Sequence, residues 1–393
     1  MRSDLKIKIN LLLGTWYGST MLTTGLLLGT SSFGQQINKD HILSASAHYG
    51  FILPHHGSMQ YLINGHTPGF EINYIKPSHG EKKWERIYHY PEIGLNLFFI
   101  SLSNPSQLGD GMALSPFINF NLNHGKRFQI MMKWTTSVGY MTKKFDRLEN
   151  HKNTVVGSNF NMYANLRFNA VYNFSPSLRM EMGLGMSHFS NGASSMPNLG
   201  INIPTLDLGF GYHFNAENTH PVWDTFSIPP KTSRVAFYAG MGINSIDPPG
   251  SQKYGGYTLS ANYERKRGNK NRWCGGLELS FNSSYLAEFR QDSTVHLTSD
   301  LQNLQVGVKG GYALIIGRLF IPIEMGCYLY SMKKSNGPIF HRIGTRVQVN
   351  DHLVVGVTLK THWAKADFFE LCLGYTMKEK VMKIKRRPIV LEK

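Results

Sequence analysis

The sequence has little charge, few cysteines and few long apolar runs. Only 17% of its 393 residues are charged, whereas an average globular protein has about 25%. At 41% hydrophobic and 12% aromatic, the chain is nevertheless too apolar to be disordered. The three cysteines, Cys274, Cys327 and Cys372, form no C-x-x-C pair, which disfavours a disulfide framework or a zinc site. After the first 35 residues no apolar run approaches the roughly 18 residues of a membrane-spanning helix, so a helical membrane protein is disfavoured.

The N-terminus has the pattern of an export signal. Arg2, Lys6 and Lys8 precede an apolar stretch, and small residues follow it up to Gly34. That order predicts a secretory signal peptide over residues 1–34, cleaved near Gly34. A membrane-anchor helix is the alternative, which the interspersed glycines disfavour. Export makes nucleic acid an unsuitable partner, so the net charge of +16 points instead to anionic lipid headgroups.

The rest of the chain alternates apolar and polar residues in long segments. Residues 159–174 show the pattern best, because one face is apolar and the other is rich in amide and guanidinium groups. The apolar face carries Phe160, Met162, Ala164, Leu166, Phe168, Ala170, Tyr172 and Phe174. Alternate side chains of a strand point to opposite faces. These segments also exceed the five or six residues of an average strand.

Long strands with one apolar face are typical of outer-membrane barrels. In a bilayer every backbone polar group must be hydrogen-bonded within the protein, so spanning strands must close into a barrel. We therefore predict an all-β, antiparallel transmembrane barrel in the bacterial outer membrane, with about 14 to 16 strands. A large secreted β-sandwich is the alternative.

One connection interrupts the alternation. Residues 215–233 are rich in proline and polar residues. They divide the chain into a first segment, 35–214, and further barrel strands over 234–377, followed by a basic tail, 378–393. The two segments form either one wide barrel or two halves of a sheet that join at this connection.

The strand predicted over 178–190 carries polar groups where lipid-facing residues are expected. Its apolar face begins at Leu178 and continues, by the same parity, to His188 and Ser190. Because these two residues are two apart, their side chains emerge side by side on the outer surface, near the extracellular rim. An imidazole can take the proton of a serine hydroxyl that attacks an ester. The alternative is that both are ordinary polar residues of the barrel rim.

The residues around this pair resemble a known family. The run 188–198, which reads H-x-S-N and ends in P-N, and the strand end 211–214, which reads G-Y-H-F, are similar to the outer-membrane lipid A 3-O-deacylases, also called acyloxyacyl hydrolases. The resemblance implies an esterase in a barrel wall, surrounded by membrane lipids. Its substrate would be lipid A of lipopolysaccharide, from which it removes an ester-linked acyl chain without a metal or organic cofactor.

The resemblance also implies roles for individual residues. His188 is the expected general base and Ser190 the expected nucleophile. Hydrogen-bond donors that stabilise the charge on the carbonyl oxygen form an oxyanion hole. The oxyanion hole and its support are implied at Asn198, Gly192, Ala193 and Asn191.

Two features depart from the family pattern. The family completes the pair with a glutamate downstream of the serine, at a position where this chain has Asn202. An amide oxygen can orient an imidazole but lacks the charge that stabilises imidazolium, so we predict an orienting Asn202 and slower turnover. Glu181 and Asp207 are poor substitutes, because their parity places them in the lumen. The family's usual barrel has about eight strands and accounts only for the first segment.

Two other functions stay open at this stage. A passive porin or transporter is favoured by the polar lumenal faces and by the strands after residue 233. A structural barrel that retains an inactive hydrolase motif is favoured by Asn202. The sequence also leaves the oligomeric state open.

Overall fold

The computed structural model of the chain describes residues 40–123, 125–216, 231–363 and 365–382. The predicted signal peptide lies outside these residues, as do most of the 215–233 connection and the end of the basic tail. No helix in the described part of the chain has the length and apolar character that crossing a membrane requires. The architecture is all-β, and every pair of neighbouring strands is antiparallel.

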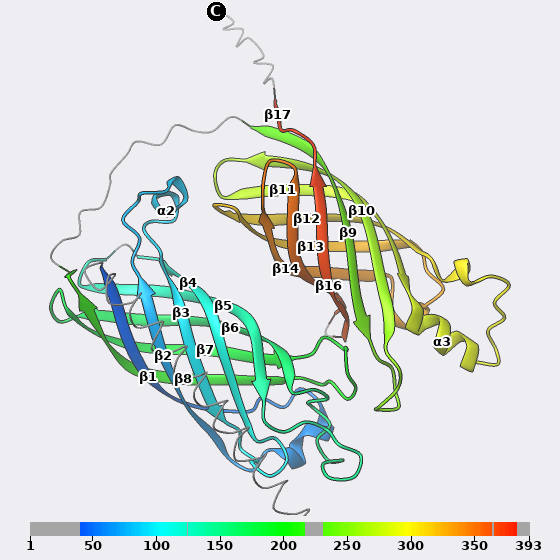
Figure 1. Cartoon of the computed structure of the whole chain (residues 1–393), viewed down its shortest axis with the longest axis horizontal. Coiled ribbons are helices and arrows are strands. Elements are labelled where there is room, and N and C mark those ends of the chain that lie inside the picture. The colour runs from blue at the N-terminus through cyan, green and yellow to red at the C-terminus, as the bar shows by residue number, and fades with distance from the viewer. Residues whose placement is uncertain (1–39, 124, 217–230, 364, 383–393) are drawn as a thin grey trace, which may run out of the picture.

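Eight strands of the described chain close the first barrel (Figure 1). They are β1 (His41–Phe51), β2 (His66–Lys76), β3 (Glu92–Ser101), β4 (Asp110–Asn121), β5 (Phe128–Met141), β6 (Phe160–Asn173), β7 (Leu178–Ser190) and β8 (Ile201–Phe214). Each strand pairs with the next one along the chain, and β8 pairs with β1 to close the barrel. The short helices η1 (Gly57–Leu62) and α2 (Lys83–Ile87) lie in its connections.

The second barrel repeats this topology within residues 232–376. Its strands are β9 (Thr232–Asn244), β10 (Tyr254–Arg267), β11 (Asn271–Asn282), β12 (Gln305–Ile316), β13 (Leu319–Tyr330), β14 (Ile339–Gln348), β15 (Leu353–His362) and β16 (Lys365–Thr376). Strand β9 pairs with both β10 and β16, which closes the ring. The start of the basic tail adds β17 (Lys380–Val381) beside β9. Helices α3 (Ser283–Gln291), η3 (Asp300–Asn303) and η4 (Lys334–Asn336) lie in the connections.

The predicted antiparallel outer-membrane barrel is therefore confirmed, and the question of one wide barrel or two halves is answered. The chain forms two separate barrels, because β8 pairs back with β1 before the second set of strands begins. A barrel of eight strands has an interior just wide enough for side chains to fill. The alternation that predicted β6 is also present, because Arg167 faces the lumen and is 1% exposed, whereas Phe168 faces outward and is 49% exposed.

Buried ion pairs occupy both lumens. In the first barrel, Lys133 Nζ lies 2.5 Å from Glu71 Oε1. In the second, Lys309 Nζ lies 2.8 Å from Glu324 Oε2, and Arg342 Nε lies 2.7 Å from Glu370 Oε2. Burying charges is costly unless they are paired in this way. Paired charged side chains thus lie inside each barrel, as expected for barrels of eight strands, whose interiors are just wide enough for side chains to fill.

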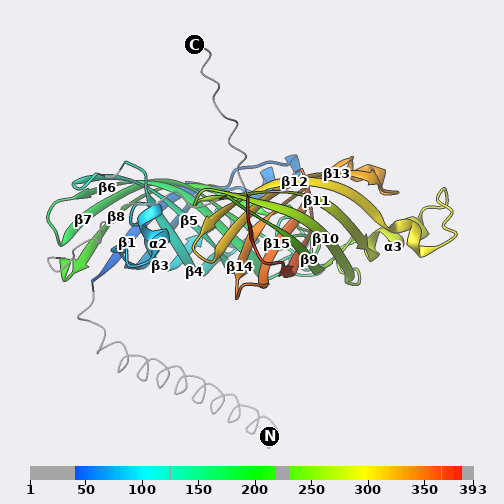
Figure 2. The ribbon, with the colours of Figure 1, turned by 90° about the horizontal axis from the view of Figure 1, so that it is seen from above.

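Side chains on the outer walls of the two barrels pack against each other. Seen from above, the two barrels lie side by side (Figure 2). An apolar cluster joins β4 and the segment after α2 to β12 and β13. Its buried members are Tyr88, Ile118, Phe120, Ile316 and Ile321. The Tyr88 hydroxyl also donates a hydrogen bond to the carbonyl of Ile315, at 2.7 Å. Apolar side chains that would otherwise face lipid are buried here against the neighbouring barrel.

Candidate functional site

His188 and Ser190 lie on the outer face of β7, at the end of the strand. The residue between them fixes this orientation. Phe189 points into the barrel, is 1% exposed and packs on Tyr163 with 4.9 Å between ring centroids. Since neighbouring side chains of a strand point to opposite faces, an anchored Phe189 directs both polar side chains outward.

The His188 ring is held by the strand beside it. In the β7–β8 register His188 stands opposite Asn202, and both point outward. His188 Nδ1 lies 2.6 Å from Asn202 Oδ1. The structure thus brings together the imidazole and the amide that the sequence placed at the family's glutamate position. Glu181 and Asp207 are buried in the lumen, as their parity predicted.

His55 extends this contact, and sequence analysis missed it. His55 Nε2 lies 2.9 Å from the carbonyl oxygen of Leu199, and Asn202 Nδ2 lies 3.3 Å from His55 Nδ1. A carbonyl only accepts, so His55 Nε2 carries the proton, and the Nδ1 of the neutral ring accepts from the Asn202 amide. The Asn202 oxygen then accepts from His188 Nδ1–H, which leaves His188 Nε2 as the acceptor.

Two N–H donors converge on the hydroxyl oxygen of Ser190. The backbone N–H of Gly192 lies 3.2 Å from Ser190 Oγ, and Asn198 Nδ2 lies 3.1 Å from it. The Asn198 amide is oriented by its own oxygen, which accepts from the backbone N–H of Asn191 at 3.0 Å. Amide donors so placed are the components from which oxyanion holes are built.

The loop 191–200 positions both N–H donors. Asn191 bridges the loop, since its side chain donates to Ser195 O (2.9 Å) and accepts from Ser195 N–H (3.2 Å). Gly192 and Ala193 have φ of +61° and +66°, the left-handed conformation that turns the chain back over the strand end. In the described residues Ala193 makes its hydrogen bond through its carbonyl, to Ser245, rather than to Ser190.

Gly200 lies close to both the serine and the histidine. A Cβ atom on Gly200 would lie 3.1 Å from His188 Cε1 and 3.4 Å from Ser190 Cβ, so both side chains flank the same backbone atom. Among the described contacts none is a hydrogen bond between Ser190 Oγ and the His188 ring, because the hydroxyl is engaged by Asn198. Hydrogen bonds of this type often tighten only when substrate binds.

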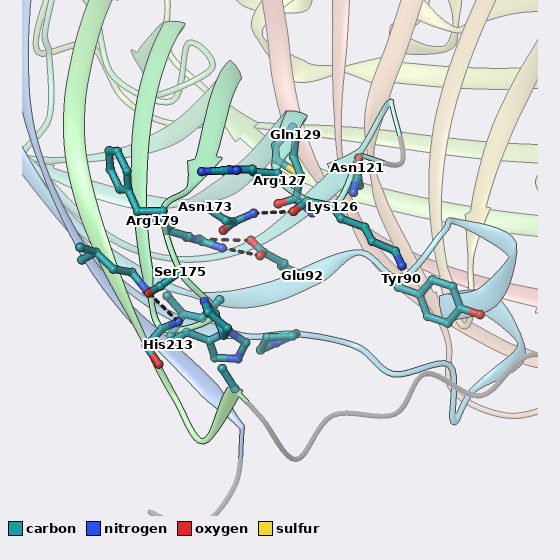
Figure 3. A pocket seen from close by; sticks show the side chains of 18 of the residues that line it. Tyr90, Glu92, Asn121, Lys126, Arg127, Gln129, Asn173, Ser175, Arg179 and His213 are labelled. Carbon is teal, nitrogen blue, oxygen red and sulfur yellow. Dashed lines mark hydrogen bonds and ion pairs between the residues drawn. The ribbon is translucent and has the colours of Figure 1, made fainter.

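A cavity of about 550 Å³ lies at the opposite end of the first barrel (Figure 3). It is lined by Lys126 and Arg127 and bordered by Arg179, which donates to Glu92 at 2.6 Å. Arg179 and Ser190 stand at opposite ends of β7, roughly 35 Å apart at about 3.3 Å per residue. The cavity is therefore separate from the polar group on the outer wall.

The described residues contain no cluster of three or more His, Cys, Asp or Glu side chains that could hold a metal ion. Cys274, Cys327 and Cys372 are free thiols.

Fold and site together define a class: an outer-membrane β-barrel with a serine, a histidine and N–H donors gathered on its outer wall. Residues 68–223 match the family described as lipid A 3-O-deacylase (PagL), and residues 233–379 match the acyloxyacyl hydrolase C-terminal domain. The two matches together span most of the chain. The protein belongs to this family of outer-membrane hydrolases.

Curated proteins and solved structures give no further indication of function. No curated protein matches the chain. Solved structures that match include Omp33 of Acinetobacter baumannii, at 7% identity and a TM-score of 0.16, covering 86% of this chain and 98% of that one. The ferric citrate transporter FecA matches at 8% identity and a TM-score of 0.22, covering 82% and 51% of the two chains. At such TM-scores the likeness carries no argument.

Proposed function

We propose that the protein is an outer-membrane esterase that hydrolyses an ester-linked acyl chain of lipid A in lipopolysaccharide. Its working pair is Ser190 and His188. The observation that carries this proposal is the outward position of both side chains, beside Asn202, in a chain of the lipid A deacylase family. A nucleophile on the outer wall reaches an acyl chain that stays in its leaflet.

In the first step Ser190 becomes acylated. The Ser190 hydroxyl turns from Asn198 toward His188, its proton passes to His188 Nε2, and Oγ forms a bond to the ester carbonyl carbon. The carbon–oxygen bond to the lipid A sugar then breaks, and the imidazolium returns the proton to the departing sugar oxygen. Gly192 N–H and Asn198 Nδ2, already within 3.2 Å of Oγ, donate to the carbonyl oxygen while it is negatively charged.

In the second step water releases the fatty acid. His188 takes a proton from water, the hydroxide oxygen attacks the acyl carbon, and the bond to Ser190 Oγ breaks with return of the proton to serine. Asn202 keeps Nδ1–H of the ring engaged, and His55 keeps Asn202 from rotating. Because the Asn202 amide is neutral, it stabilises the imidazolium less than a carboxylate would.

The test is expression of the full chain in a Gram-negative bacterium, followed by mass spectrometry of lipid A. Wild type should produce lipid A that lacks one acyl chain, and Ser190→Ala should leave it intact. If Ser190→Ala still removes the chain, the assigned nucleophile is wrong. If wild type changes nothing, the porin alternative or the inactive-motif alternative replaces the esterase.

A further inference from the structure

The loop that presents the oxyanion donors is held from outside its own barrel. Ser245 N–H donates to Ala193 O at 2.8 Å, and Ser245 Oγ donates to Ser194 O at 3.1 Å. Ser245 follows β9 and therefore belongs to the second barrel. Two consecutive carbonyls of the loop are thus fixed by one residue of the neighbouring domain.

A lysine completes this contact. Lys253 stands just before β10 and donates to Ser194 O, to Ser195 Oγ at 3.2 Å and to Ser245 Oγ at 2.9 Å. All three donor positions of an ammonium group are used. Lys253 therefore ties the loop of the first barrel to the β9–β10 connection of the second.

An aromatic ring of the second barrel also packs against the loop. Phe369 of β16 lies so close to Gly192 that a Cβ atom there would stand 2.3 Å from the ring. Gly192 is the residue whose N–H points at Ser190 Oγ. The ring packed against Gly192 leaves no room for a side chain, and its φ of +61° also favours glycine.

We propose that the second barrel is a positioning element of the first barrel's site. Ser245, Lys253 and Phe369, which we call the inter-barrel clamp, hold loop 191–195 in the conformation that aims the Gly192 N–H at Ser190. The proposal rests on the esterase function proposed above. It gives the second barrel a role in an acyl transfer that takes place on the first.

The role predicts a particular kinetic pattern. An oxyanion donor acts on the charge that develops in the transition state, so its misplacement lowers kcat rather than raising KM. Complete loss of one such donor costs about 10²–10³-fold in kcat. In a loosened loop the Gly192 N–H is still present but occupies a wider range of positions. We therefore expect kcat to fall by about tenfold to a hundredfold.

The experiment compares Lys253→Met and Phe369→Ala with matched controls in the second barrel. Lys334→Met removes an exposed lysine of η4, and Leu371→Ala removes a side chain of β16 that is 65% exposed. Purified full-length variants are assayed for kcat and KM on lipid A, and for the rate at which a fluorophosphonate labels Ser190. Folding is checked by the heat-dependent mobility of closed barrels on gels.

The expected result is a lower kcat and slower labelling in the clamp variants only, with KM unchanged. Ser245→Ala removes one hydroxyl of the clamp and keeps Lys253, so it should lower kcat less. It takes the place of Lys253→Met or Phe369→Ala if either of these variants fails to fold. Clamp variants that behave like the controls, or that raise KM alone, overturn the positioning role while leaving the esterase intact. A wild-type chain that neither deacylates lipid A nor is labelled at Ser190 overturns both proposals.

Discussion

The two barrels share one topology and differ at the end of the seventh strand. In the first, β7 ends with His188 and Ser190 facing outward, and the long loop 191–200 follows. In the second, β15 also ends in a histidine, but His362 is 5% exposed and its Nε2 lies 2.9 Å from the Tyr328 hydroxyl. The two barrels therefore have the same strand order but not the same polar site. The direction in which the side chains point and the length of the following loop determine that this site lies on the first barrel.

Replacing the outward serine should have the largest effect. Ser190→Ala removes the proposed nucleophile, and we expect deacylation to fall by at least about 10³-fold. The matched control is Ser187→Ala, because Ser187 lies on the same strand but faces the lumen, where it bonds to Asn165. Lipid A mass spectrometry gives both values. Equal activity of the two variants would contradict the assignment.

The amide beside the imidazole should come next. Asn202→Ala leaves His188 Nδ1 without its 2.6 Å partner, so the ring loses its orientation, and we expect kcat to fall about a hundredfold. Asn202→Glu supplies a carboxylate and should raise kcat above wild type, because the negative charge stabilises imidazolium. If Asn202→Glu lowers kcat as much as Asn202→Ala does, Asn202 does not act by orienting the His188 ring and stabilising its charged form.

A methyl group added at Gly200, close to both side chains, should have an intermediate effect. Gly200→Ala places a Cβ 3.1 Å from His188 Cε1 at a φ of +75°. The displaced ring and the strained backbone together should lower kcat about tenfold, at a cost of about 1–2 kcal/mol in stability. Gly337→Ala, in the second barrel, has φ of +76° but open space around it. It should share the strain and keep full activity, as steady-state kinetics and thermal unfolding will show.

The histidine of the second barrel should matter least. His362→Gln keeps a polar group near the Tyr328 hydroxyl, and His362 is far from lipid on the inner face of β15. We expect no change in lipid A deacylation. A loss comparable to that of Asn202→Ala would mean that the second barrel also takes part in the reaction.

The strands were predictable because alternation depends on neighbouring residues alone. The lipid face of β7 and the lumenal positions of Glu181 and Asp207 follow from parity, and the structure has them there. Contacts between distant segments leave no such local signal. His55 is 147 positions from Asn202, and nothing in the sequence pairs them.

The division into two barrels was also not decided by the sequence. Whether the first barrel closes depends on whether the eighth strand pairs with the first strand or with the ninth, and both of these have suitable apolar faces. The hydrogen bonds between β8 and β1 settle it. The clamp of Ser245, Lys253 and Phe369 follows from the way the closed barrels then meet, so it was equally inaccessible to pattern reasoning.

The inward anchoring of Phe189 has a consequence for how this gene can change. Losing or gaining one codon between Leu178 and Phe189 would exchange the two faces of the strand end while the barrel could still close. Imidazole and hydroxyl would then turn inward, and a phenyl ring would replace them in the bilayer. Substitutions on the outer wall change one side chain at a time, whereas a one-residue insertion or deletion changes which face every following side chain of the strand occupies.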